Sequence, residues 1–91
     1  MAQQDYNHAI TLMENAIKRG GNGIPEIYYN LGVCYLYSGM YKKAEENFIN
    51  TLSLSPNLAM GYRALAEAFA KQNKNSEAQQ CMERYRQLGG Q

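Results

Sequence analysis

Tryptophan is absent from this chain of 91 residues, and histidine, proline and cysteine occur once, twice and twice. A single histidine, His8, cannot form the pair of imidazole ligands that many metal sites use. Cys34 and Cys81 lie far apart in the sequence and have no Cys-x-x-Cys spacing. Such thiols are typical of small buried side chains in a reducing compartment. No apolar run approaches the roughly 20 residues that cross a bilayer.

The chain also lacks an excess of charge of either sign, because nine Lys and Arg oppose eight Asp and Glu, for a formal net charge of +1. No basic cluster indicates nucleic-acid binding, and no Lys/Arg-rich amphipathic helix indicates binding to a membrane surface. The N-terminus, Met1–Asp5, has no signal-like segment, so we expect a cytoplasmic protein. The length suits one small domain, residues 1–91.

The residues needed for catalysis are also missing. Glu45 and Glu46 are adjacent, so a helix points them to different sides. The glycine-rich segment 20–23 lacks the Lys-Ser/Thr of a phosphate loop. Cys34 has no histidine at a spacing that would activate it. We therefore expect no enzyme activity, no cofactor and no bound metal.

What the sequence does contain is a period of 34 residues. Large residues lie over large ones and small over small when residues 25–58 are written above the segment from residue 59 onward. The matching pairs are Tyr28 and Tyr62, Leu31 and Leu65, Gly32 and Ala66, Tyr35 and Phe69, Ala44 and Ala78, and Phe48 and Met82. The N-terminal stretch matches the same pattern, but at an offset of 35 residues in place of 34. The one additional residue lies in the glycine-rich segment.

Each period is predicted to form two helices, because its bulky residues recur at steps of three and four. We expect Gly39 to end a helix in a left-handed conformation and Asn57 to cap the start of the fourth helix. The five helices are predicted over residues 5–19, 25–38, 41–54, 57–72 and 76–88. No segment predicts a strand.

The residues Tyr28-x2-Leu31-Gly32-x2-Tyr35, Ala44-x3-Phe48 and Pro56 resemble the signature of the tetratricopeptide repeat family. Residues 25–58 are close to a full repeat, residues 59–88 to a weaker one, and residues 5–19 to the second helix of another. The resemblance implies an all-α solenoid of antiparallel helix hairpins in a right-handed superhelix, with five helices. It also implies a scaffold for protein–protein interaction that binds a peptide or partner protein in its concave groove.

In that family the first helix of each repeat lines the groove, so the resemblance assigns partner binding to the outward positions of those helices. They are Tyr29, Asn30, Val33, Tyr37, Arg63, Glu67 and Lys71. Some members also bind the terminal carboxylate of a peptide with Lys, Asn and Arg side chains. Asn30 matches that asparagine, but Met60 and Ala64 replace the lysine and arginine, so we expect no high-affinity binding of chaperone C-terminal peptides.

The ends of the predicted stack are apolar, which terminal repeats normally avoid. Either the chain is a piece of a longer or engineered array, or two copies cover each other's ends as a homodimer. The second hypothesis makes the chain a structural unit that associates with itself through Met82, Tyr85 and Leu88.

Overall fold

The structure is a computed structural model that describes residues 3–90, with side chains from residue 5 onward. Five α-helices and one short 3-10 helix follow one another, and the described residues contain no strand. The elements are α1 (Gln3–Lys18), η1 (Gly21–Gly23), α2 (Pro25–Tyr37), α3 (Tyr41–Leu54), α4 (Ala59–Lys71) and α5 (Asn75–Gln87). The predicted five-helix, all-α architecture is confirmed.

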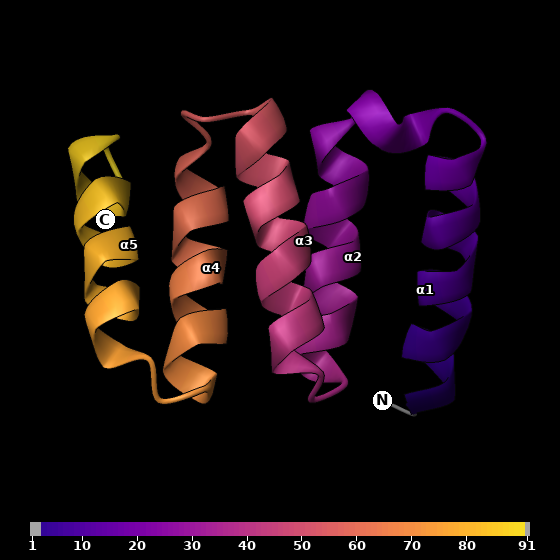
Figure 1. The fold of residues 1–91 in the computed structure, drawn as a ribbon, viewed down its shortest axis with the longest axis horizontal. Helices are drawn as coiled ribbons and strands as arrows, with labels where there is room; N and C mark the ends of the chain where they lie inside the picture. Colours follow the sequence, from indigo (N-terminus) through magenta and orange to yellow (C-terminus); the bar gives the residue numbers. More distant parts are fainter. Residues whose placement is uncertain (1–2, 91) are drawn as a thin grey trace.

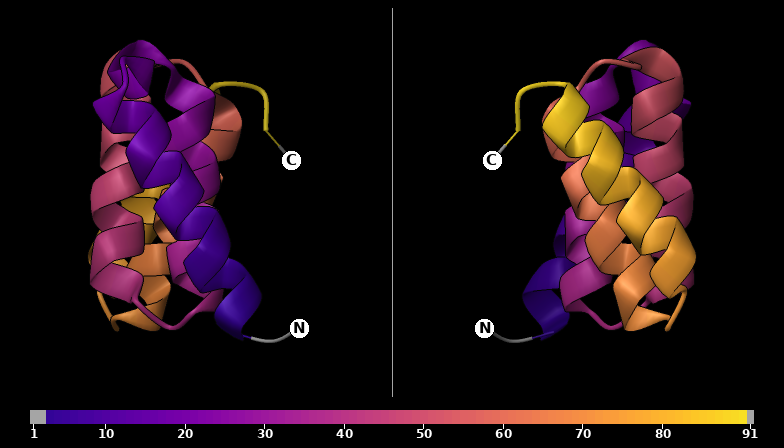
Figure 2. Two further views of the ribbon diagram at one scale, coloured as in Figure 1. Left: turned by 90° about the vertical axis from the view of Figure 1, so that its right-hand side faces the viewer. Right: turned by 90° about the vertical axis from the view of Figure 1, so that its left-hand side faces the viewer.

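The helices stand side by side in chain order, and the turns between them alternate between the two ends of the stack (Figure 1). Each helix packs mainly against its neighbours in sequence, and α2 also reaches α4. Seen edge-on, α1 and α5 run obliquely across the two outer sides of the stack (Figure 2). This arrangement is an α-solenoid, in which every hairpin buries its apolar side against the next one.

The helix ends repeat with the same period as the helices. Gly39 follows α2 with φ of 83°, as predicted, and Met40 N–H donates to the carbonyl of Tyr35 at 2.9 Å. At the end of α4, Asn73 has φ of 62° and Lys74 N–H donates to Phe69 at 2.9 Å. A left-handed residue at this position satisfies the last helical carbonyls and reverses the chain.

One local prediction needs correction. Asn57 does not cap α4: it lies in the turn after Pro56, the helix begins at Ala59, and the preceding Leu58 makes no side-chain cap bond. In the glycine-rich segment, Gly21–Gly23 form one turn of 3-10 helix and Gly21 is buried. A Cβ on Gly21 would lie 2.8 Å from the carbonyl oxygen of Ala16, which leaves no room for a side chain.

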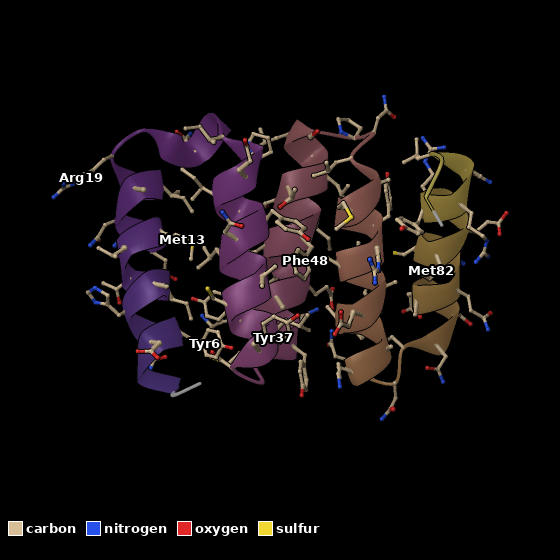
Figure 3. All side chains as sticks on the ribbon, turned by 180° about the vertical axis from the view of Figure 1, so that it is seen from behind. Tyr6, Met13, Arg19, Tyr37, Phe48 and Met82 are labelled. Carbon is tan, nitrogen blue, oxygen red and sulfur yellow. The ribbon has the colours of Figure 1, made fainter. Side chains whose placement is uncertain are left out.

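The closest packing in the core joins α2 to α3. Gly32 faces the ring of Phe48 so tightly that a Cβ at Gly32 would lie 2.6 Å from the ring atom Cε1. Phe48 and the adjacent Ala44 are fully buried, with 0% exposure each. Phe48 points into the interface between α2 and α3 (Figure 3). The small residues predicted at the helix crossings therefore set how near the two backbones come.

We expect Gly32→Ala to destabilise the protein by about 1–2 kcal/mol. Alanine gains about 1 kcal/mol of helix propensity, but overpacking a core that cannot relax costs about 1–3 kcal/mol. Urea unfolding followed by circular dichroism measures the difference. Adding Phe48→Met should recover part of the loss, since Ala66 and Met82 form that pair in the next unit.

Gly61→Ala is the matched control, because its Cβ would come closest to Cδ2 at the end of the flexible Leu52 side chain, at 2.8 Å, and its other neighbours, Leu52 Cγ and Leu58 Cδ2, are at 3.3 and 3.7 Å. It should be near neutral. Equal destabilisation by both changes would show that the Phe48 contact is not special.

A buried carboxylate joins the two halves of the stack. Glu45 on α3 is 7% exposed and accepts hydrogen bonds from Gln72 Nε2 at 2.9 Å and Lys74 Nζ at 3.3 Å. Gln72 directly follows α4, and Lys74 directly precedes α5. Lys42 adds a contact at 3.3 Å. Burial alone would raise the pKa of Glu45, but these hydrogen bonds together outweigh it and lower the pKa.

A lowered pKa in the folded state predicts that Glu45 stabilises the fold above its unfolded pKa of about 4.3, and that this contribution disappears as the pH falls through the folded value. Glu45→Gln should therefore cost about 1–2 kcal/mol at pH 7 and little at pH 3, by denaturant unfolding at both pH values. Glu46→Gln, at the exposed neighbouring position, serves as the control. An equal cost of Glu45→Gln at both pH values would contradict this assignment.

Candidate functional site

The residues predicted to bind a partner lie mostly along one hollow face between α2 and α4. Tyr29, Val33, Tyr37, Arg63 and Glu67 line a hollow of about 200 Å³, together with Leu36, Met60 and Ala64. A second hollow, of about 410 Å³, is lined by Pro25, Glu26, Tyr29, Asn30, Ser55, Leu58 and Met60. Because Tyr29 and Met60 border both hollows, they form one continuous surface, which we call the α2–α4 groove.

The predicted residues are not equally available within the groove. Tyr37 is 61% exposed, whereas Tyr29 is half-buried and its ring lies 5.8 Å from that of Phe48. Lys71 is exposed at the end of α4, outside the lining of both hollows. Ala64 stands 34 positions after the predicted outward residue Asn30, but it is only 9% exposed because it packs into the core.

Two residues, one beside the groove and one within it, were not predicted to bind a partner. Tyr6 on α1 lies with its ring centroid 6.3 Å from that of Tyr37, at an angle of 39°. The two rings are neighbours at one end of α1 and α2 (Figure 3). Met60 on α4 is 47% exposed in the middle of the groove. The period marks Tyr6 as an α1 core residue, and only the packing of α1 on α2 brings it to Tyr37.

The groove combines an apolar centre with isolated charges. Tyr37 and Met60 offer large exposed apolar surface, while Arg63 and Glu67 on α4 are exposed beside them. Aromatic and Arg side chains of this kind contribute most of the binding free energy in protein interfaces. The surface can therefore hold an apolar side chain and orient the polar groups around it.

One polar contact fixes α1 beside the groove. The hydroxyl of Tyr35 on α2 donates to Glu14 Oε2 on α1 at 2.6 Å, and Lys43 Nζ lies 5.6 Å from the centre of the Tyr35 ring. Burial makes the largest contribution and the hydrogen bond to Glu14 the next largest, and together they raise the pKa of Tyr35 to about 12. The hydroxyl therefore stays protonated and keeps donating throughout the neutral range.

Tyr35→Phe should loosen α1 without changing the core, since the ring remains. Losing a hydrogen bond to a charged acceptor costs about 1–2 kcal/mol. Amides of α1 should exchange about fivefold faster or more, while those of α3 change little. Hydrogen exchange measured by mass spectrometry separates the two helices, with Tyr41→Phe as the control. Equal acceleration in both helices would mean that the contact supports the whole fold and not the docking of α1.

The residues predicted for self-association differ in their access to solvent. Met82 and Leu88 are half-buried, but Tyr85 is 8% exposed and lies under the turn after α5. A Cβ on Gly90 would be 2.4 Å from Tyr85 Cε1, so the backbone itself covers the ring. Tyr85 therefore packs within its own chain, and of the three only Met82 and Leu88 present surface at this end.

The remaining polar chemistry is sparse. Burial raises the pKa of both thiols, Cys34 and Cys81, and Glu77 raises that of Cys81 further. Within residues 3–90, no three His, Cys, Asp or Glu side chains are close enough together to hold a metal ion. No helix among those residues has both the length and the apolar character needed to cross a membrane.

Comparison with known proteins agrees with this architecture. The sequence profile of the tetratricopeptide repeat family matches residues 25–58. Residues 25–58 thus match one tetratricopeptide repeat, and the stack around them has a helical-repeat fold. Such repeats are typically non-catalytic modules for protein interaction. Among curated proteins, none matches the chain.

Solved structures share the fold. A crystal structure of MamA protein superposes with a TM-score of 0.85 at 24% identity, covering 91% of this chain and 45% of that one. A structure of MamA AMB-1 gives 0.87 at 24% identity, covering 93% and 49%. The chain thus spans about half the length of these similar structures. At this level of identity, the likeness concerns the fold alone.

Proposed function

We propose that the chain is a non-catalytic scaffold that binds a segment of a partner protein in the α2–α4 groove. The observation that carries the proposal is that Tyr37 and Met60, which are 61% and 47% exposed, line the same hollow. Removing such side chains from water on binding gives about 1.5–3 kcal/mol each. An isolated exposed apolar residue is ordinary, whereas two that border the same hollow support a binding surface there.

The groove favours a short segment with one bulky apolar residue. Such a residue would lie between Tyr37 and Met60, with Tyr6 extending the aromatic wall. Arg63 and Glu67 on α4 then offer one charge of each sign to polar groups of the ligand. The mixed charge disfavours a strongly acidic C-terminal tail, in agreement with the absence of the carboxylate-binding lysine and arginine.

Selection of random twelve-residue peptides displayed on phage, followed by fluorescence anisotropy with the selected peptides, tests this surface. We expect the selected peptides to share a large apolar residue. Tyr37→Ala should weaken their binding about tenfold or more, as truncating an interface aromatic commonly does.

Ile49→Ala is the matched control, because Ile49 is a similarly exposed residue, at 43%, on α3. It should leave the affinity unchanged. Selected peptides that bind Tyr37→Ala and Met60→Ala as tightly as the original chain would rule out the α2–α4 groove as the binding surface.

The alternative function, self-association through the terminal helices, is supported by Leu12. This residue on α1 is 57% exposed, and its counterpart in α5, Cys81, is buried against α4. Copies joined in this way would form a dimer whose mass in light scattering falls when Leu12 or Met82 is made polar. A monomer at high concentration would eliminate this alternative and leave the groove proposal intact.

A further inference from the structure

The methionines among the described residues differ in their access to solvent. Met13 and Met82 are half-buried and pack against the core. Met40 and Met60 are 42% and 47% exposed. A thioether that solvent reaches is open to oxidation, whereas one that is packed against other side chains is shielded. An oxidant in solution therefore reaches Met40 and Met60 first.

The two thiols of the chain are poor competitors for such an oxidant. Cys34 is half-buried and Cys81 is 9% exposed. Burial raises the pKa of both thiols, and a thiol reacts readily only after it has lost its proton. A thioether has no proton to lose, so its reaction depends on access alone. Access favours the two exposed methionines over both cysteines.

Only one of the two exposed methionines lines the α2–α4 groove. Met60 borders the smaller hollow together with Tyr37 and the larger hollow together with Leu58. Met40 lies in the turn before α3, outside the lining of both hollows. A ligand side chain placed between Tyr37 and Met60 would contact the Met60 thioether. Met40 therefore serves as an exposed methionine of the same chain that lies apart from this surface.

Oxidation changes the polarity of the groove at its centre. Hydrogen peroxide transfers one oxygen atom to the sulfur, which loses two electrons, while the O–O bond breaks and water is released. The product is a polar sulfoxide in place of an apolar thioether.

The free chain accommodates the sulfoxide oxygen better than a complex does. In the free chain the oxygen accepts hydrogen bonds from water, and Asn30 and Arg63 are exposed donors that line the larger and the smaller hollow. Against an apolar ligand side chain the same oxygen has no donor, and burying it unpaired is unfavourable. Oxidation of Met60 therefore favours the free chain.

We propose that Met60 is a redox switch of the α2–α4 groove: a peroxide blocks the binding of apolar ligands, and reduction of the sulfoxide restores it. The inference rests on the proposed function, since it concerns a ligand bound in that groove. Met60 lies in the first turn of α4 with its side chain exposed, so its oxidation leaves the core in place. Methionine sulfoxide reductases return the thioether, with a dithiol supplying the two electrons and becoming a disulfide as water is released.

The test uses the whole chain and those phage-selected peptides whose binding Tyr37→Ala weakens. The chain is treated with hydrogen peroxide at about pH 5.5, where the thiols stay protonated, until Met60 is partly oxidised. It is then passed over an immobilised peptide, and mass spectrometry locates the sulfoxides in the bound and unbound fractions. We expect Met60 sulfoxide to be enriched about fivefold or more in the unbound fraction, because its oxygen has no donor in the complex. Met40 sulfoxide should be distributed evenly.

Two leucine variants provide matched controls, since leucine keeps an apolar side chain but has no sulfur. For each variant the affinity after peroxide is divided by the affinity before it. Met40→Leu should lose affinity on oxidation as the original chain does, whereas Met60→Leu should show no loss. Treating the oxidised original chain with both classes of sulfoxide reductase should restore its affinity, and circular dichroism should show the same helical fold throughout.

Three results would overturn the proposal. They are an even distribution of Met60 sulfoxide between the fractions, a loss of affinity in Met60→Leu as large as in the original chain, and no recovery after reduction. In each case the peptides still bind the groove, so the proposed function stands. If Tyr37→Ala weakens none of the selected peptides, the groove function itself fails, and the switch fails with it.

Discussion

The contact between Gly32 and the ring of Phe48 sets the geometry on which the rest of the structure depends. A ring at the van der Waals limit of a helix backbone requires a residue with no side chain, and it fixes the distance between α2 and α3. That hairpin then presents a surface of defined shape to α4. Because each unit of a solenoid packs on its neighbours, a change in the distance between α2 and α3 would shift α4, and with it the helix that follows.

In the second unit, a different pair of residues occupies the two positions of this contact. Ala66 replaces the glycine, and the flexible Met82 replaces the rigid phenylalanine. A larger residue on one helix is thus balanced by a more adaptable residue on the other, since Met can fill irregular space at little cost. The core volume is shared between helices, so neither position can be understood by itself.

Much of the fold could be predicted from sequence because its contacts are local and periodic. Helix bounds, the left-handed Gly39 and the small residues at the crossings all follow from residues within one repeat. The failures arise where the deciding partner lies in another repeat or where two local signals compete. Glu45 offers no sequence signal for Gln72 and Lys74, and Tyr6 offers none for Tyr37, because each partner comes from a neighbouring unit. The Asn57 side chain is of a type that caps helices, but Asn57 forms a turn with Pro56, and α4 begins only at Ala59.

The α2–α4 groove is a face of the stack, so outward positions on the predicted helices account for most of it. The exceptions show what a single repeat leaves open. Ala64 stands at the counterpart of the exposed Asn30, yet it is only 9% exposed because it packs into the core. Lys71 stands at an outward position, yet it lies beyond the lining of both hollows. Position within a repeat determines which side of a helix faces outward, whereas the depth at which a side chain lies is decided by the neighbouring helices.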